Sequence, residues 1–224
     1  MRRGTTSALI VAVAAALMAV ATLDARARWF PVPVDEQREL YVADGRLLAH
    51  ATLGFDAVAA DVYWIRAVQH YGRDRRSLTY EGRYALLHPL IDVTTTLDPY
   101  FSVAYQFGAV FLAEPLPNGP GRLDLGLALL EKGLAVEPDR WQYAQYLGFL
   151  HYWHGTDRTA AARAFERAAR IPGAPNWLQP LAVGMLVEGG ERDAAVTMLR
   201  EMTRSEDRWI RELAERKLAE IGAR

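Results

Sequence analysis

The sequence predicts an all-α protein in which pairs of helices repeat along one chain. Three observations support this fold class. From Leu47 onward, apolar residues recur at the three- and four-residue spacing of amphipathic helices. No stretch shows the sustained alternation and β-branched enrichment that is typical of a strand. Pro99, Pro138 and Pro172 each follow a helical stretch, and the last two are 34 residues apart.

Composition excludes several function classes. The 224-residue chain has 26 basic and 27 acidic residues, and its formal net charge is -1. A general nucleic-acid binder needs a basic surplus to neutralise phosphates, so nucleic acid is not an expected partner. The chain has no cysteine, which excludes disulfides, thiol catalysis and thiolate metal sites.

The N-terminus has the features of a signal peptide or a signal-anchor. Arg2 and Arg3 precede an uncharged stretch over residues 4–23. A helix of that length rises about 30 Å, which matches the thickness of a bilayer core. Small residues at 19–21 and 25–27 form candidate cleavage sites, so removal of the segment is the other interpretation.

We therefore expect three segments along the chain. Residues 1–28 form the signal-anchor or signal peptide, and residues 29–45, which contain two prolines and an Asp-Gly pair, form a linker. Residues 46–224 form the helical repeat domain. Its final stretch, 210–221, has one apolar and one charged side, which is typical of a helix that caps a repeat array.

The spacing of small, aromatic and proline residues resembles the tetratricopeptide repeat family. One repeat matches at Ala144, Leu147, Gly148, His151, Ala161, Phe165, Ala168 and Pro172. The repeat before it matches at Ala104, Phe107, Gly108, Phe111, Gly126, Leu130, Gly133 and Pro138. Degenerate matches near Trp64 and Leu178 extend the resemblance to about residues 58–205.

This resemblance implies a right-handed superhelical solenoid of about four tetratricopeptide-like helix pairs. A hydrophobic helix precedes the solenoid and a capping helix closes it. The resemblance assigns the packing between helices to small residues and the ring that fills the space beside them, namely Gly108, Gly133, Gly148, Phe165 and Ala168. With the N-terminal segment, the run 53–64 is also similar to membrane-anchored or exported bacterial repeat proteins of unassigned function.

The resemblance also implies a concave groove that is lined by the first helix of each pair and binds another protein or a peptide segment. The expected lining residues are Gln69, Tyr105, Gln142, Gln145, Phe149, Tyr152, Trp153 and Gln179. Amides can pair with the backbone of an extended peptide, and aromatic rings supply anchor area. Aromatic residues at this spacing are equally typical of packing between repeats, so both interpretations stay open.

No group of residues indicates an enzyme, a metal site or a cofactor, and no small-molecule substrate is expected. His151 and His154 are three residues apart on a helix, but a metal site needs a third ligand, so packing is favoured. Asp56, Asp61 and Asp92 are better interpreted as caps or ion-pair partners than as an acid–base pair. Glycine-rich phosphate loops, zinc motifs and nucleophile elbows do not occur in the sequence.

Three further local features of the sequence predict surface or helix properties. The basic run of Arg73, Arg75, Arg76 and Arg83 could contact anionic lipid headgroups or form a solvated loop. The proline- and glycine-rich loop 114–121 is long enough to be functional. Pro89 falls inside an expected helix and predicts a kink there.

The sequence thus predicts a non-enzymatic interaction scaffold or assembly factor at the bacterial cell envelope. The expected location is the inner membrane, with a single N-terminal pass and the repeat domain in the periplasm. If the first segment is a signal peptide, the domain is exported after cleavage. The alternative function is a constitutive structural subunit of a membrane protein complex.

Overall fold

The computed structural model describes residues 2–29, 44–77, 82–155 and 157–222. Within these ranges the chain forms eleven α-helices and one short π-helix, and no strand. The predicted all-α class is therefore confirmed. The chain divides into two compact units, Met1–Glu39 and Leu40–Arg224. Most of the expected linker, residues 30–43, lies outside the described residues.

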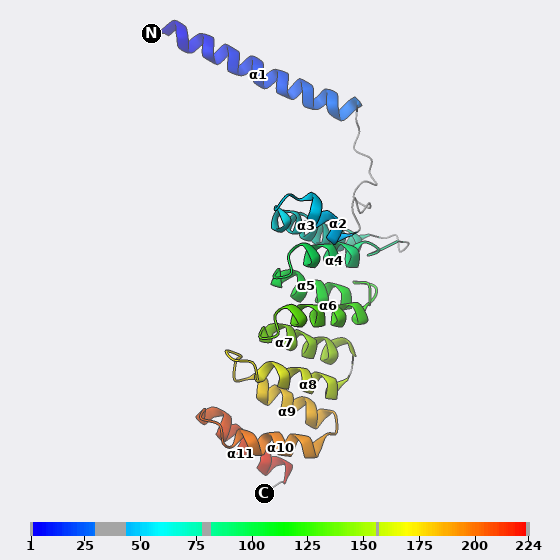
Figure 1. Ribbon diagram of the computed structural model, residues 1–224, viewed down its shortest axis with the longest axis vertical. Coiled ribbons are helices and arrows are strands. Elements are labelled where there is room, and N and C mark those ends of the chain that lie inside the picture. Colours follow the sequence, from blue (N-terminus) through cyan, green and yellow to red (C-terminus); the bar gives the residue numbers. More distant parts are fainter. Residues whose placement is uncertain (1, 30–43, 78–81, 156, 223–224) are drawn as a thin grey trace. The chain divides into compact units, whose positions relative to one another are not determined.

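The described residues of the first unit form one helix, α1 (Arg2–Trp29) (Figure 1). Near its end the Thr22 hydroxyl donates a hydrogen bond to the Met18 carbonyl at 2.9 Å, and Arg28 pairs with Asp24 at 2.8 Å. Both contacts link residues four apart, which are neighbours on a helix. No helix in the described part of the chain combines the length and the apolar character that crossing a membrane requires.

The second unit contains the remaining helices, which follow one another with short connections. They are α2 (Gly45–Ala51), α3 (Asp56–Arg76), α4 (Leu87–Leu97), α5 (Ser102–Ala113), α6 (Leu123–Val136), α7 (Trp141–Leu150), the π-helix η2 (His151–Gly155), α8 (Arg158–Ala169), α9 (Leu178–Glu188), α10 (Arg192–Met202) and α11 (Arg208–Ile221). From α3 onward, each packs chiefly on helices that lie next to it in the chain, so α3 to α11 succeed one another along the unit (Figure 1).

Caps and prolines explain where several of these helices begin and end. The carboxylates of Asp44, Asp157 and Asp207 accept backbone N–H groups at the starts of α2, α8 and α11, each at 2.8 Å. Pro99, Pro138 and Pro172 lie two or three residues beyond the ends of α4, α6 and α8. Since proline has no N–H to donate, it favours a helix end at these points.

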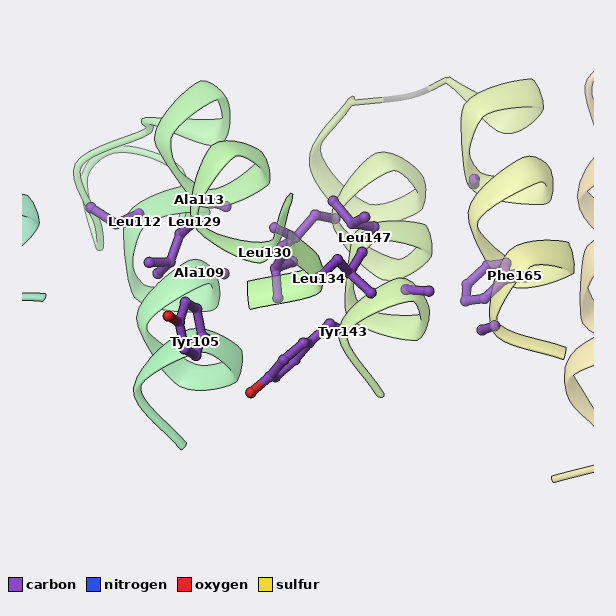
Figure 2. Packing of buried hydrophobic residues seen from close by; sticks show 14 of the residues in the cluster. Tyr105, Ala109, Leu112, Ala113, Leu129, Leu130, Leu134, Tyr143, Leu147 and Phe165 are labelled. Atoms are coloured by element: carbon purple, nitrogen blue, oxygen red, sulfur yellow. The ribbon is translucent and has the colours of Figure 1, made fainter. Parts of the chain in front are cut away.

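The core runs through the second unit as one cluster of buried side chains. Its largest fully buried members include Tyr105, Tyr143 and Phe165, which come from α5, α7 and α8 (Figure 2). The rings of Tyr105 and Tyr143 lie 5.3 Å apart between centroids. A Cβ atom on Gly133 would lie 3.0 Å from each ring, so glycine at this position lets both tyrosines pack on α6.

Two further glycines lie where helices approach closely. A Cβ atom on Gly108 would lie 3.1 Å from Ile91 of α4 and 3.1 Å from Leu129 of α6. At Gly148 the added atom would lie 2.5 Å from the Phe165 ring, and Ala168 is fully buried on the same helix as that ring. A larger side chain at either glycine would force neighbouring side chains to move.

Candidate functional site

The candidate site lies on one side of α7 and of the π-helix that continues it. Gln142, Gln145, Phe149 and Trp153 are three or four residues apart, so they follow one side of the helical segment 141–155. A π-helix occurs mostly as a single wide turn, and such turns are frequent at functional sites. Here the π-turn carries Tyr152 and Trp153.

Phe149 and Trp153 form the centre of this surface. Their rings are stacked, with centroids 4.6 Å apart and an interplanar angle of 6°. The Phe149 ring also packs nearly perpendicular to the buried Phe165 ring, and the two ring centroids are 5.2 Å apart. Trp153 remains 54% exposed. The structure thus presents a large aromatic ring to solvent on a base that is fixed to the core.

Gly148 makes this base possible. Its missing side chain leaves room for the Phe165 ring against the backbone of α7, where a Cβ atom would lie 2.5 Å from the ring. Phe165 therefore lies directly beneath the turn that carries Phe149. The exposed Trp153 ring is linked to the core through Phe149 and Phe165 in series.

Tyr152, the neighbour of Trp153 in the chain, has different contacts. The Arg158 guanidinium lies 4.4 Å from the centre of the Tyr152 ring and donates a hydrogen bond to the Tyr152 carbonyl at 2.9 Å. Arg158 also pairs with Glu188 of α9 at 3.1 Å. One arginine therefore fixes the π-turn to α8 and α9 through charge-assisted and cation–π contacts.

The histidines of this segment have no metal-binding arrangement. His151 is partly buried, and the loss of solvation lowers the pKa of its imidazole, against a smaller raising effect of Asp157 and Glu131. His151 lines a pocket with Glu131, Asp157, Arg163 and Arg167. Over the described residues, no group of three or more acidic or histidine side chains could hold a metal ion.

The structure corrects one expected lining residue. Tyr105 is completely buried between α4, α6 and α7, and its hydroxyl approaches the Thr95 carbonyl at 3.5 Å. Burial raises the pKa of Tyr105 to about 12 because the phenolate would lose its solvation. Tyr105 therefore cannot contact a partner, since Gly133 and Tyr143 enclose its ring.

The expected amides are not gathered in one pocket. Gln69 is exposed on α3, and Gln145 is partly buried on α7. Gln142 lines a pocket with the 137–141 turn and Pro172, whereas Gln179 lines a separate pocket between α8 and α10. Among the expected lining residues, the structure thus joins only Phe149 and Trp153 by a direct ring contact.

Two of the three carboxylates considered as acid–base candidates, Asp56 and Asp92, have structural contacts, and Asp61 is exposed. Asp56 accepts a hydrogen bond from the Thr52 hydroxyl one turn earlier. Asp92 accepts one from the Lys132 ammonium at 2.8 Å, and the same ammonium donates to the Thr95 hydroxyl at 2.9 Å. The Lys132 contacts join α4 to α6.

Sequence reasoning missed a buried polar network at the end of α3. The Asp74 carboxylate accepts the Tyr84 backbone N–H at 2.7 Å and lies 3.4 Å from the His70 ring. The Tyr84 hydroxyl donates to the Asn118 carbonyl at 2.6 Å, which fixes the loop 114–121. The partners are 10 and 34 residues apart, so no local pattern could have revealed them.

The chain was compared with protein families, curated proteins and solved structures. No protein family, no curated protein and no solved structure matches the chain. The function must therefore be inferred from the chain's own residues and their geometry.

Proposed function

We propose that the protein is a non-enzymatic interaction scaffold or assembly factor at the bacterial cell envelope. In this proposal α3/α4, α5/α6, α7/α8 and α9/α10 are four tetratricopeptide-like pairs wound into a right-handed solenoid, and α11 caps it. The order in which neighbouring helices pack supports this arrangement. The close approaches at Gly108, Gly133 and Gly148 also support it, because they occur at positions where the repeat requires small residues.

The proposed location is the inner membrane, with a single pass through α1 and the second unit in the periplasm. The basic start at Arg2 and Arg3 and the uncharged stretch 4–23 support it. The support is the sequence pattern alone, since no helix in the described part of the chain meets the length and apolar requirement for crossing a membrane. Cleavage after the small residues at 19–21 or 25–27 would instead release the second unit as an exported protein.

The stacked pair of Phe149 and Trp153 carries the proposal that another protein or peptide segment is bound. Exposed tryptophans on a rigid base are typical of positions that dominate binding energy, and losing one commonly costs about 2 kcal/mol or more. Gln142 and Gln145 lie on the same side of α7 and can donate and accept hydrogen bonds with a peptide backbone. Because these residues carry no charge, the expected ligand is a segment that is neither strongly acidic nor strongly basic.

Crosslinking tests this proposal. The full-length protein would be crosslinked in its native membranes and captured, and the proteins that accompany it would be identified. Trp153→Ala should remove one specific partner while circular dichroism remains unchanged. Trp209→Ala, which removes another exposed tryptophan on α11, is the matched control and should retain that partner. An identical partner set for Trp153→Ala and the wild type would refute binding at this surface.

A constitutive subunit of a membrane protein complex is the second candidate. Val103 and Phe107 favour it, because both are apolar side chains exposed on α5. A constitutive subunit should co-purify with its complex at fixed stoichiometry and lose stability when it is produced alone. A scaffold should remain folded when purified alone and bind its partner reversibly.

A further inference from the structure

The outer side of α3 is an exposed apolar stripe. Val58, Val62 and Ile65 are all exposed and are four and three residues apart, so they lie on one side of the helix. The opposite side packs into the core through Ala60 and Ala67, which are completely buried. Helix α3 is therefore apolar on two opposite sides, although only one of them is covered by the described residues.

Two more exposed apolar residues precede α3, in the turn that follows α2. Leu53 is 86% exposed and Phe55 is 69% exposed. The backbone of Leu53 is left-handed, with φ at 52°, a conformation that is costly for a residue with a branched side chain. Such strained positions cluster at functional sites, where the surroundings retain them. Here the residue with the strained backbone is Leu53, and both it and Phe55 expose their side chains to solvent.

Comparison with the later helices shows what α3 lacks. Helices α5, α7, α9 and α11 each pack on the helix that precedes them, whereas α3 has no comparable contact with α2. At the other end of the unit, α11 exposes the charged side chains of Glu212, Glu215 and Arg216. Arrays of helix pairs need polar outer ends to remain soluble, and the α3 end does not meet this requirement.

The charges beside the stripe are arranged asymmetrically. Arg75 and Arg76 are exposed in the last turn of α3, and Arg46 is exposed next to the exposed Leu47 of α2. The nearby acidic residues mostly accept hydrogen bonds: Asp44 caps α2, Asp56 accepts one from the Thr52 hydroxyl, and Asp74 is buried against the Tyr84 amide. Asp61 is the exposed exception. The surface around the stripe thus offers mainly cations to whatever covers it.

We propose that this apolar stripe, which comprises Val58, Val62 and Ile65 with Leu53 and Phe55 before them, lies on the surface of an anionic lipid bilayer. The apolar side chains would enter the boundary between headgroups and acyl chains, and the arginines at the end of α3 would contact lipid phosphates. A bilayer offers an apolar layer to the exposed hydrophobic side chains and anionic phosphates to the arginines beside them. The inference rests on the proposed membrane location and adds a second contact, made by the helical domain itself.

Because the chain has no cysteine, single labels can test this surface. Full-length Val62→Cys would carry an environment-sensitive fluorophore and be reconstituted into phosphatidylcholine vesicles, with or without phosphatidylglycerol. Its emission should shift to the blue with phosphatidylglycerol. The matched control, Ala194→Cys on an exposed position of α10, should show no shift. Adding Arg75→Ala and Arg76→Ala should lower the ratio of docked to undocked protein about fivefold per arginine.

A third label, Leu17→Cys on α1, separates the two proposals. If residue 17 lies in the bilayer while the label at 62 stays aqueous in both vesicle types, the stripe does not face lipid and the membrane location still holds. If both labels stay aqueous, the membrane location fails and the stripe proposal fails with it. A blue shift at 62 that grows with protein concentration in the absence of vesicles would show that a second copy covers the stripe, which also overturns the proposal.

Discussion

Gly148 and the Phe165 ring lie so close that a Cβ atom on residue 148 would be 2.5 Å from the Cε1 atom of the ring. This contact joins α7 to α8 beneath the stacked rings of Phe149 and Trp153. The packing of the core and the presentation of the exposed tryptophan therefore depend on the same glycine.

Replacing Gly148 with alanine should destabilise the protein. The added methyl group overpacks the α7–α8 contact, so the free energy of unfolding should fall by about 1–3 kcal/mol in urea denaturation. Gly184→Ala is the matched control, because no atom lies within 4 Å of its added Cβ. Inside α9 that substitution should raise stability by about 0.5–1 kcal/mol. Equal effects of the two substitutions would contradict the packing role of Gly148.

Removing the side chain of Arg158 should loosen the π-turn. Arg158→Ala deletes the contacts with the Tyr152 ring, the Tyr152 carbonyl and Glu188. The expected loss is about 1–3 kcal/mol, with faster amide exchange over residues 151–155. Arg200→Ala removes an exposed arginine from α10 and should leave that exchange unchanged. Unaltered exchange in Arg158→Ala would show that the π-turn is held by other contacts.

Burial of Tyr105 makes the fold sensitive to high pH. Its folded-state pKa is raised from 10.0 to about 12, chiefly by burial, so the unfolded chain loses this proton first. The stabilising contribution is complete below pH 10 and is lost as the pH rises through the folded-state value. Tyr105→Phe should flatten the fall in unfolding free energy over this interval, whereas Tyr100→Phe, at an exposed position, should not. If the unfolding free energy of Tyr105→Phe fell with pH as steeply as that of the wild type, Tyr105 would not be the cause of the fall.

The start of α11 should weaken in acid. The hydrogen bond from Asn176 and the Trp209 amide lower the pKa of Asp207 below its ordinary 3.8. The carboxylate therefore stabilises α11 above that pH, and the contribution disappears as the pH falls through the lowered value. Amide exchange in α11 should accelerate there. Asp207→Asn retains a capping oxygen but cannot titrate, so its exchange should lose this pH dependence. A pH dependence that persists in this variant would contradict the assignment to Asp207.

Local patterns predicted the helices but not all of their boundaries. The prolines after α4, α6 and α8 marked helix ends because the missing N–H acts within a few residues. Pro89 was expected to kink a helix. Instead α4 begins at Leu87, so Pro89 is its third residue, where a backbone N–H has no partner within the helix. The expectation was wrong because the start of α4 has no capping side chain that could have marked it.

The candidate site was predictable only in part. Helical spacing placed Phe149 and Trp153 on one side of α7, and they do stack. The resemblance to the repeat family placed Tyr105 in the groove, because a repeat pattern cannot reveal that Gly133 of another helix leaves room for its ring. The contact between Arg158 and Tyr152 depends on the π-turn, and the ion pair of Arg158 joins it to Glu188, which is 30 residues away. No local sequence pattern indicates either contact.

The order in which the helices of the second unit pack has a consequence for how the chain folds. Its main helix contacts join elements that are adjacent or one removed along the chain. Such short-range topologies fold fast, because little loop entropy is lost before contacts form. A chain that emerges from its N-terminus during synthesis or translocation could thus complete each pair before the next appears. On this route the outer side of α3 forms early, and within the described residues it stays exposed after α4 to α11 have packed.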